Sequence, residues 1–301
     1  MENTDVSLPK DKQYAVTDKG VQLALTVEEY DEMNKLHNYI LEIMLAVDKF
    51  CRENNITYYL GEGTLLGAVR DGGFIPWDDD ADIVMLREDY ERFLELAADG
   101  LEDGYQLDCL ATNPKHWSIP STIQITRHTE FEKEMFRGIA LNCGPNIDIF
   151  PLDYTPSDVN LDLRIRGKII RTLKRSLWIK TGLHTKSKYK SLKRKFAYYY
   201  PCRLISAFSS IKSLHKAINK LMLKTSDAKN EYLINFASLY HVSKETFKKE
   251  WYGNPIEIEF EGHKFYAPSD SDKVLKTLYK DYMKMPPVEK RKSKHHFNNF
   301  E

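Results

Sequence analysis

Apolar residues recur along the chain with two different spacings, and the alternation between them predicts a mixed α/β protein. Helical spacing comes first, between Thr26 and Asn54, at the positions Met33, Leu36, Ile40, Ile43, Val47 and Cys51. Thr26 and Glu29 stand three residues apart at the start of this stretch, as in a capping box. The pattern therefore predicts a long amphipathic helix that begins at Thr26.

Short β-branched and aromatic runs predict strands in the first half of the chain. The expected strands cover residues 57–60, 82–86, 105–110, 121–127 and 146–150. A short helix is expected over 65–70, and a second amphipathic helix over 89–96 ends near Gly100. Asp153 follows Pro151 and is interpreted as a turn residue, with contact to substrate as its alternative role. Helices and strands that alternate in this way indicate a small α/β (α+β) core with a mixed sheet.

The rest of the chain divides where its composition changes. Helical spacing dominates from 160 to 224, and a hairpin is predicted over 256–260 and 263–266. We therefore expect four parts, which are a polar N-terminal arm (1–25), an α/β core (26–159), a basic helical insertion (160–225) and a C-terminal segment that packs back on the core (226–301).

Overall composition predicts a soluble protein. The chain has 301 residues, no net charge and a mean hydropathy of −0.52. No apolar run reaches the roughly 18 residues of a membrane span, and the polar start Met1-Glu2-Asn3 does not resemble a signal peptide. The cysteines, which are Cys51, Cys109, Cys143 and Cys202, show neither a pairing pattern nor zinc spacing. A reduced, cytoplasmic protein is the simplest interpretation.

Charge is distributed unevenly along the chain. Residues 164–224 contain 18 Lys and Arg and no Asp or Glu, whereas residues 1–163 contain 13 Lys and Arg against 32 acidic residues. The basic segment is interpreted either as a solvated helix face or as a surface for anionic lipid or a phosphate-rich acceptor. No helix-turn-helix or RNA-binding signature accompanies it, so we expect no nucleic-acid partner.

Four carboxylates follow a short apolar stretch at Asp78, Asp79, Asp80 and Asp82. In an extended chain Asp78, Asp80 and Asp82 point to one face, with neighbours about 7 Å apart, and Asp79 points to the other. An acidic surface loop or a calcium loop would also explain them. Apolar neighbours (Ile75, Trp77, Ile83, Val84 and Met85) indicate a half-buried cluster, where like charges are costly without a cation. Magnesium, which prefers carboxylate and phosphate oxygens, suits this pattern.

Gly61, Gly63 and Thr64 precede the short predicted helix. Unhindered N–H groups at a helix N-terminus can hold a phosphate, although the two glycines would also serve simply to shape a turn. The Thr64 hydroxyl is expected either to contact substrate or to cap the helix.

Two arginines are candidates for phosphate contact. Arg70 lies at the end of the short helix, and its alternative role is an ion pair with Asp71 or Asp79. Arg127 follows a predicted strand, where a surface role is equally expected.

Four separated motifs resemble the LicD family of bacterial phosphotransferases, which are related to fukutin and fukutin-related protein. They are Gly-Glu-Gly-Thr-Leu-Leu-Gly-Ala-Val-Arg from residue 61, Phe-Ile-Pro-Trp-Asp-Asp-Asp-Ala-Asp from 74, Ile-Asp-Ile-Phe-Pro-Leu-Asp from 147 and the tail Tyr-Lys-Asp-Tyr-Met-Lys-Met-Pro-Pro from 279. The resemblance spans roughly 26–291 and is weakest in the middle third.

The resemblance implies a nucleotidyltransferase-like core and assigns roles to the acids. In it Asp80 and Asp82 hold metal ions and Asp148 is the third ligand, near the nucleophile. Asp78 is an alternative ligand, because strand geometry lets either Asp78 or Asp82 share a compact metal pair with Asp80.

The same resemblance implies an activity. It is the transfer of a phospho-alcohol from a CDP-activated donor to a hydroxyl of a glycan or lipid-linked saccharide, with Mg²⁺ or Mn²⁺ as cofactor and CMP released. Phosphocholine is the first choice; ribitol, glycerol and ethanolamine phosphates stay open. Such a reaction belongs to the synthesis of surface polysaccharide, teichoic acid or lipopolysaccharide, and residues 164–224 would contact the inner face of an anionic membrane. The alternatives are a nucleotidyltransferase that transfers a nucleoside monophosphate and a non-enzymatic polyanion-binding protein.

Overall fold

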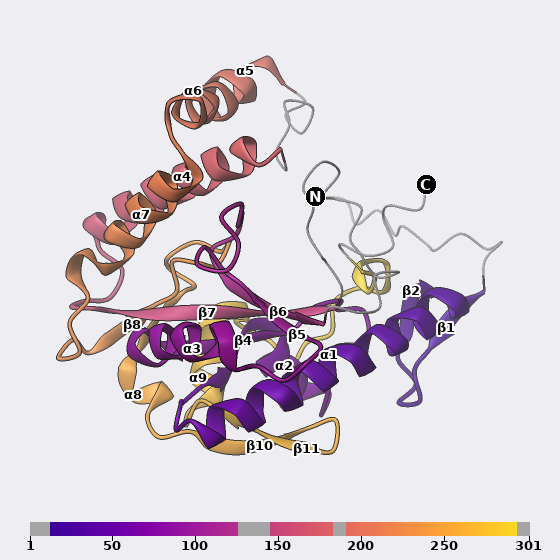
Figure 1. The fold of residues 1–301 in the computed structure, drawn as a ribbon. Helices are drawn as coiled ribbons and strands as arrows, with labels where there is room; N and C mark the ends of the chain where they lie inside the picture. Colours follow the sequence, from indigo (N-terminus) through magenta and orange to yellow (C-terminus); the bar gives the residue numbers. More distant parts are fainter. Residues whose placement is uncertain (1–12, 126–144, 183–190, 294–301) are drawn as a thin grey trace.

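The computed structural model describes residues 13–125, 145–182 and 191–293, which are arranged around one mixed sheet (Figure 1). Its strand order is β3 (Tyr59–Leu60), β4 (Asp82–Leu86), β7 (Asn146–Thr155), β6 (Ser121–Ile125) and β5 (Tyr105–Asp108). The strands β8 (Tyr232–Ile234) and β9 (Thr246–Lys248) continue the sheet from the end of β7. The β4–β7 pair is parallel, whereas β3–β4, β6–β7 and β5–β6 are antiparallel. The predicted mixed α/β fold is confirmed.

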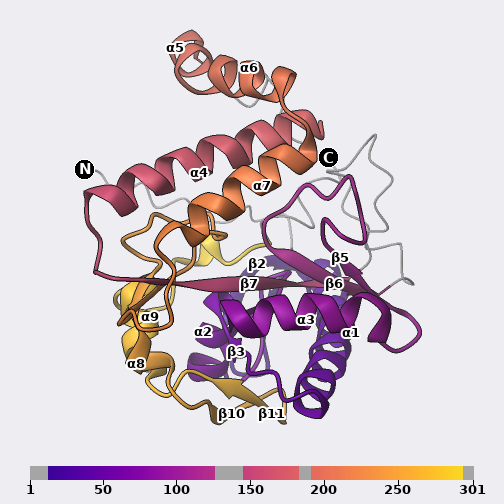
Figure 2. The same cartoon turned by 60° about the vertical axis from the view of Figure 1, so that its left-hand side comes forward.

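Helices lie on both sides of this sheet. The helices α1 (Val27–Glu53) and α3 (Arg87–Gly100) contact β7 and lie below the sheet in Figure 2. Above it in the same view lie α4 (Leu161–Lys180) and α7 (Ile211–Met222), which contact each other. The helix made of α5 (Leu192–Arg194), the π-helical turn η4 (Lys195–Tyr199) and α6 (Tyr200–Phe208) lies farthest from the sheet.

The first helix follows from its sequence pattern. All six predicted apolar positions between Met33 and Cys51 are buried. The predicted capping box is confirmed, since the Glu29 N–H donates to Thr26 Oγ1 at 3.2 Å and the Thr26 N–H donates to Glu29 Oε2 at 2.7 Å. The cap fixes where the helix begins, and the apolar stripe fixes which face meets the core.

Replacing Thr26 by Ala is expected to lower the free energy of unfolding by about 1 kcal/mol, because the side-chain acceptor of the cap is lost. Urea denaturation of the purified variant measures this change. Glu28→Ala is the control, since Glu28 also lies in the first turn but contributes neither hydrogen bond of the box. Equal destabilisation of the two variants would contradict the role of the cap.

Strand β7 is longer than predicted, because it continues past Pro151 to Thr155. Asp153 therefore lies within a strand, and its interpretation as a turn residue is wrong. Its fully buried carboxylate accepts hydrogen bonds from Arg87 Nε at 2.7 Å and Arg87 Nη2 at 3.0 Å. A proline is typical of the end of a strand, but β8 pairs with Asp153, Tyr154 and Thr155 and extends the ladder.

The N-terminal segment departs from the expected polar arm. Within it β1 (Tyr14–Val16) and β2 (Gln22–Thr26) pair as an antiparallel hairpin, and Ala15, Leu23 and Leu25 are buried. Alternation of apolar and polar residues in β2 gives this short strand a buried face. The remainder of the predicted arm, residues 1–12, lies outside the described residues.

The C-terminal segment contains a second hairpin and returns to the first half of the chain. It comprises α8 (Lys249–Tyr252), the predicted hairpin β10 (Ile256–Phe260) and β11 (His263–Ala267), α9 (Ser271–Tyr279) and η6 (Val288–Lys290). The hairpin contacts β3 and the helix α2 (Glu62–Arg70), and η6 contacts β2. The division of the chain into domains stays a prediction.

The described parts of the basic segment are mainly helical, as predicted, and end in η5 (Leu223–Thr225), but their charges are not all solvated. Arg166 and Lys174 on α4 are each only 3% exposed. Lys174 lies on the same buried stripe as Leu163, Ile170 and Leu177. Within the described ranges, none of the helices combines the length and the hydropathy needed to cross a membrane.

Candidate active site

Parallel pairing of β4 with β7 brings together two acids that are distant in the sequence. Asp82 and Asp148 are register partners, and the Asp148 N–H donates to the carbonyl of Ala81 at 2.9 Å. Partners in neighbouring strands are separated by about 4.8 Å and direct their side chains to the same face. The two half-buried carboxylates therefore lie side by side at the start of β4.

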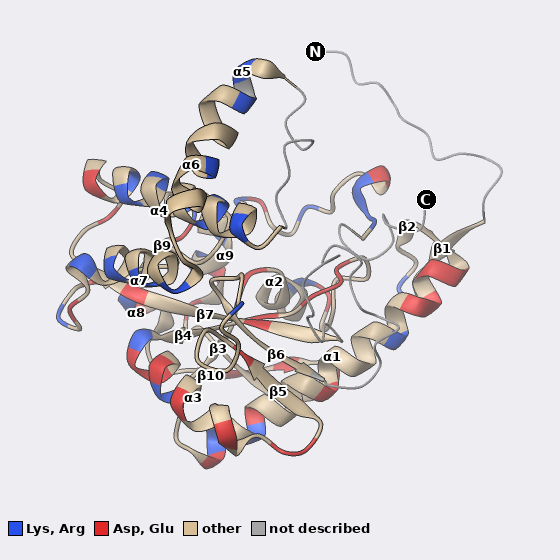
Figure 3. Ribbon diagram, turned by 45° about the horizontal axis from the view of Figure 1, so that its top comes forward, with Lys and Arg blue, Asp and Glu red and all other residues tan. Residues whose placement is uncertain are grey.

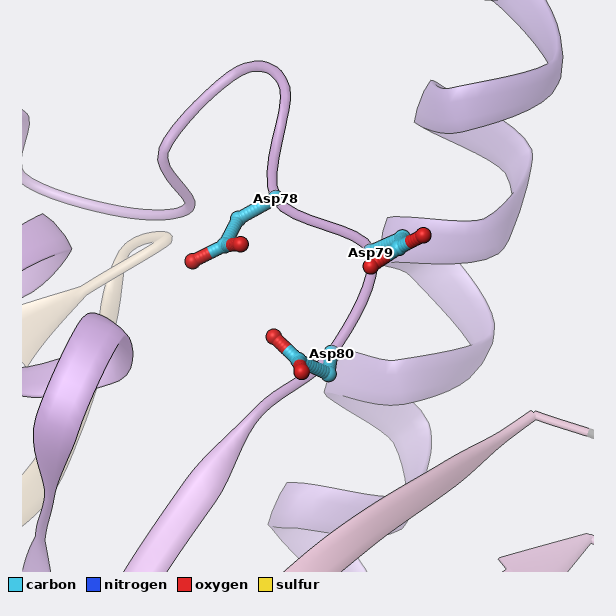
Figure 4. Close-up of side chains that lie close together, drawn as sticks. All are labelled: Asp78, Asp79 and Asp80. Carbon is cyan, nitrogen blue, oxygen red and sulfur yellow. The ribbon is translucent and has the colours of Figure 1, made fainter. Parts of the chain in front are cut away.

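The acids before β4 form a second group that adjoins this pair (Figure 4). One ligand oxygen from each of Asp78, Asp79 and Asp80 lies within 4.8 Å of the others. Asp78 and Asp80 direct their carboxylates toward the same space, and that of Asp79 points away from it. Asp79 Oδ2 instead accepts a hydrogen bond from the Ser293 hydroxyl at 2.6 Å. These residues precede the strand, and their side chains alternate as predicted.

The electrostatics of this group favour a bound cation. Burial, followed by the charges of Asp80 and Asp148, raises the pKa of Asp82 well above its ordinary value. Glu62 and Asp78 contribute further to this increase. Carboxylates held so close repel one another unless a cation neutralises them. Hard oxygen ligands of this kind are the donor set that Mg²⁺ or Mn²⁺ prefers.

Two buried glutamates adjoin the aspartates, and neither was predicted from the sequence as a site residue. Glu62 is 8% exposed and adopts a left-handed backbone with φ of 42° at the first position of α2. Burial and then the charge of Glu245 raise the pKa of Glu62. Glu245 is 1% exposed, and burial raises its pKa to about 7. A strained backbone at a buried acid is a frequent property of functional sites.

Lys174 supplies a buried positive charge to the same region. Its ammonium donates to the carbonyl of Ala237, and the charges of Glu245 and Asp148 favour its protonated form. Burial is nevertheless the largest effect and lowers its pKa to about 8. Its position on the apolar stripe of α4 is a sequence signal that could have identified it, whereas Glu245 stands in a polar stretch with no such signal.

The glycine turn at residues 61–63 lies in close contact with Asp78 and with strand β4. A Cβ atom on Gly63 would lie 2.6 Å from Asp78 Oδ2, and one on Gly61 would lie 2.8 Å from Val84 Cγ1. Thr64 Oγ1 accepts a hydrogen bond from the Asp82 N–H at 2.7 Å, so it joins α2 to β4. The turn thus positions two of the acids, and its predicted contact with phosphate stays a prediction.

The predicted arginines are not both placed by the structure. Arg70 pairs with Asp71, with Nη2 and Oδ2 2.8 Å apart, and its guanidinium carbon lies 5.9 Å from the centre of the Trp77 ring. The expected alternative, an ion pair with Asp71, is therefore formed. Arg127 lies outside the described residues. The phosphate contacts of both arginines stay predictions.

The side chain of His37 contacts the backbone of the acidic residues. The ring of His37 on α1 stacks on Phe74, with centroids 4.2 Å apart, and its Nε2 lies 2.7 Å from the carbonyl oxygen of Asp78. Burial lowers the pKa of His37 to about 4, so the ring is neutral near pH 7 and donates this hydrogen bond through Nε2–H. This contact fixes the backbone of Asp78 rather than its carboxylate.

Comparison with known proteins identifies the family. Residues 55–159 match the family described as LicD/FKTN/FKRP, nucleotidyltransferase domain. The chain is 30% identical to the lipopolysaccharide cholinephosphotransferase LicD of Haemophilus influenzae over 269 residues, which cover 85% of this chain and 92% of that protein. Shorter matches are to uncharacterised proteins of Rickettsia typhi (36% identity over 81 residues, 27% of this chain and 26% of that protein) and Rickettsia prowazekii (41% over 63 residues, 21% and 24%). The chain belongs to the LicD family of phosphotransferases.

Proposed function

We propose that the protein transfers phosphocholine from CDP-choline to a hydroxyl of a cell-surface glycan and releases CMP. The observation that carries this proposal is the register of Asp82 beside Asp148, with Asp78 and Asp80 adjoining them. The similarity to the Haemophilus influenzae enzyme, whose name states choline phosphate transfer to lipopolysaccharide, supports the choice of group and acceptor.

In this proposal Asp78, Asp80, Asp82 and Asp148 hold Mg²⁺. A bound divalent cation would neutralise the diphosphate and the charge that develops during transfer. The donor set fits this role, because it consists of carboxylates, and burial followed by their mutual repulsion raises the pKa of Asp82. The charge of Asp148 favours the protonated form of Lys174, so this ammonium lies close enough to the carboxylate to interact with it.

The chain's own residues would then act on the acceptor. The acceptor oxygen forms a bond to the phosphorus that carries choline, and the bond from that phosphorus to the bridging oxygen breaks. The electron pair of the broken bond leaves on the phosphate of CMP. Asp148 accepts the proton of the attacking hydroxyl and passes it to solvent. In-line geometry of this kind depends mainly on positioning, which the β4–β7 ladder provides.

The residues around Glu62 and Glu245 are suited to bind an alcohol that carries a positive charge. Tyr240 and Tyr279 lie edge to face, with ring centroids 6.3 Å apart. Burial, followed by the charge of Glu62, raises the pKa of both phenols, so these rings lie near that glutamate. Aromatic faces together with carboxylates are the groups that recognise a quaternary ammonium. Neutral alcohols such as ribitol or glycerol carry no positive charge for such surroundings to recognise.

Donor choice is tested by melting the purified protein with Mg²⁺ and each of CDP-choline, CDP-ethanolamine, CDP-glycerol and CDP-ribitol. CDP-choline is expected to raise the melting temperature most, because a ligand at 100 times its Kd stabilises by about 2.7 kcal/mol. Incubation with lipopolysaccharide oligosaccharide should then release CMP. Release of pyrophosphate from CTP, with no CMP from any CDP-alcohol, would identify a nucleotidyltransferase and overturn the proposal.

A further inference from the structure

The helix formed by α5, η4 and α6 carries an apolar stripe that the described part of the chain leaves exposed. Its members recur every fourth residue and are Leu192 (67% exposed), Phe196 (64%), Tyr200 (37%), Leu204 (62%) and Phe208 (86%). A helix that faces water normally shows polar residues on its outer side. The exposure of this stripe therefore needs an explanation.

The stripe is not the side by which the helix attaches to the protein. α6 packs on α4 through a different side, where Cys202 and Ser206 are buried. Figures 1 and 2 both show this helix at the edge of the molecule farthest from the sheet. The π-helical turn η4 has more residues per turn than an α-helix. Residues four positions apart therefore stay closer to the same side of the helix.

The basic residues beside the stripe indicate the kind of surface that it would contact. Lys193, Lys195 and Arg203 are each adjacent in sequence to a member of the stripe, and residues 164–224 contain no acidic residue. Figure 3 shows basic residues along α4 to α7, while acidic residues gather on α1 and α3. Large apolar side chains bordered by Lys and Arg are typical of helices that lie in the interface of an anionic membrane.

We propose that residues 192–208 lie in the plane of an anionic lipid bilayer. Leu192, Phe196, Leu204 and Phe208 would enter the boundary between headgroups and acyl chains, and the neighbouring basic residues would contact lipid phosphates. The stripe would therefore contact the lipid surface itself, and one amphipathic helix would make this contact. The proposal depends on this helix alone, and it stands whether or not choline phosphate is the group transferred.

The test is flotation of the full-length protein with vesicles of phosphatidylcholine alone or mixed with phosphatidylglycerol. The wild-type protein is expected to float with the anionic vesicles and not with the neutral ones. Leu204→Ser/Phe208→Ser should lower the partition coefficient at least about tenfold, because two buried apolar side chains are lost. Lys193→Gln/Lys195→Gln/Arg203→Gln should weaken binding and reduce its dependence on salt.

The matched control is Leu96→Ser/Ile256→Ser, which removes two exposed apolar side chains from α3 and β10. This variant should float like the wild type, and melting curves show that every variant is folded. Flotation of Leu204→Ser/Phe208→Ser equal to the wild type would overturn the proposal, as would no flotation of the wild type. Light scattering that shows a wild-type dimer and a monomeric Leu204→Ser/Phe208→Ser, without flotation, would assign the stripe to a second copy of this chain instead.

Discussion

Replacing Asp80 by Asn is expected to lower the rate of CMP release at least about a hundredfold and to leave the fold intact. Even residues that only support metal ligands typically change affinity or activity by about 10–100-fold, so loss of a ligand should reach the upper end. Asp80 is also the residue whose charge contributes most, after burial, to the raised pKa of Asp82. Without added metal, the variant should therefore melt at or above the wild-type temperature, and Mg²⁺ should stabilise it less than the wild type.

The neighbouring residue provides a matched control for this prediction. Asp79→Asn removes the same charge one position away, but that carboxylate points away from Asp78 and Asp80 and accepts from Ser293. The amide oxygen of Asn can still accept this hydrogen bond, so activity should stay within a few fold of the wild type. Full activity of Asp80→Asn, or equal loss in both variants, would show that the alternation of these side chains has no catalytic meaning.

Gly63→Ala is expected to lower the activity strongly and to leave the stability of the fold almost unchanged. The new methyl group would lie 2.6 Å from Asp78 Oδ2, which is the end of a flexible side chain. The carboxylate can rotate away at little cost to folding, but it would then leave the position beside Asp80. We expect CMP release to fall about 10–100-fold, as when a ligand loses its correct orientation, with a change in melting temperature of only a few degrees.

Gly67→Ala, on the same helix, should show the opposite behaviour. A Cβ there would collide with the backbone carbonyl of Gly73, which cannot rotate away alone. The melting temperature should therefore fall, since strain in the backbone destabilises the whole turn. If Gly63→Ala instead unfolds the protein, or retains full turnover while folded, the glycine does not act by making room for Asp78.

The sequence predicted the elements whose determinants are local. Thr26 and Glu29 are three residues apart, so their reciprocal hydrogen bonds can be predicted from the sequence alone. The alternation of Asp78, Asp79 and Asp80 is likewise a property of an extended chain. The resemblance to a known family supplied the remaining step, the expectation that Asp148 lies close to these acids, and the β4–β7 register places it beside Asp82.

What the sequence did not predict depends on tertiary contacts. Nothing near Glu245 marks it as buried, because its environment is created by α2 and α4 from distant parts of the chain. In the sequence Lys174 is one more charge of a basic segment, although it shares its buried helix face with Leu163, Ile170 and Leu177. The turn prediction for Asp153 fails because its partner, Arg87, lies 66 positions away and stabilises a buried carboxylate within the strand.

The parallel ladder between β4 and β7 has a consequence for how the site would handle the cation that we propose. Backbone hydrogen bonds, rather than the ion, hold the strands that carry Asp82 and Asp148 at their separation. A site held in this way would exist before the proposed cation binds and would persist after its release, in contrast to small zinc domains that unfold without metal. Discrimination among divalent ions would then depend on how far short aspartate side chains can reach, and turnover would require no refolding between cycles.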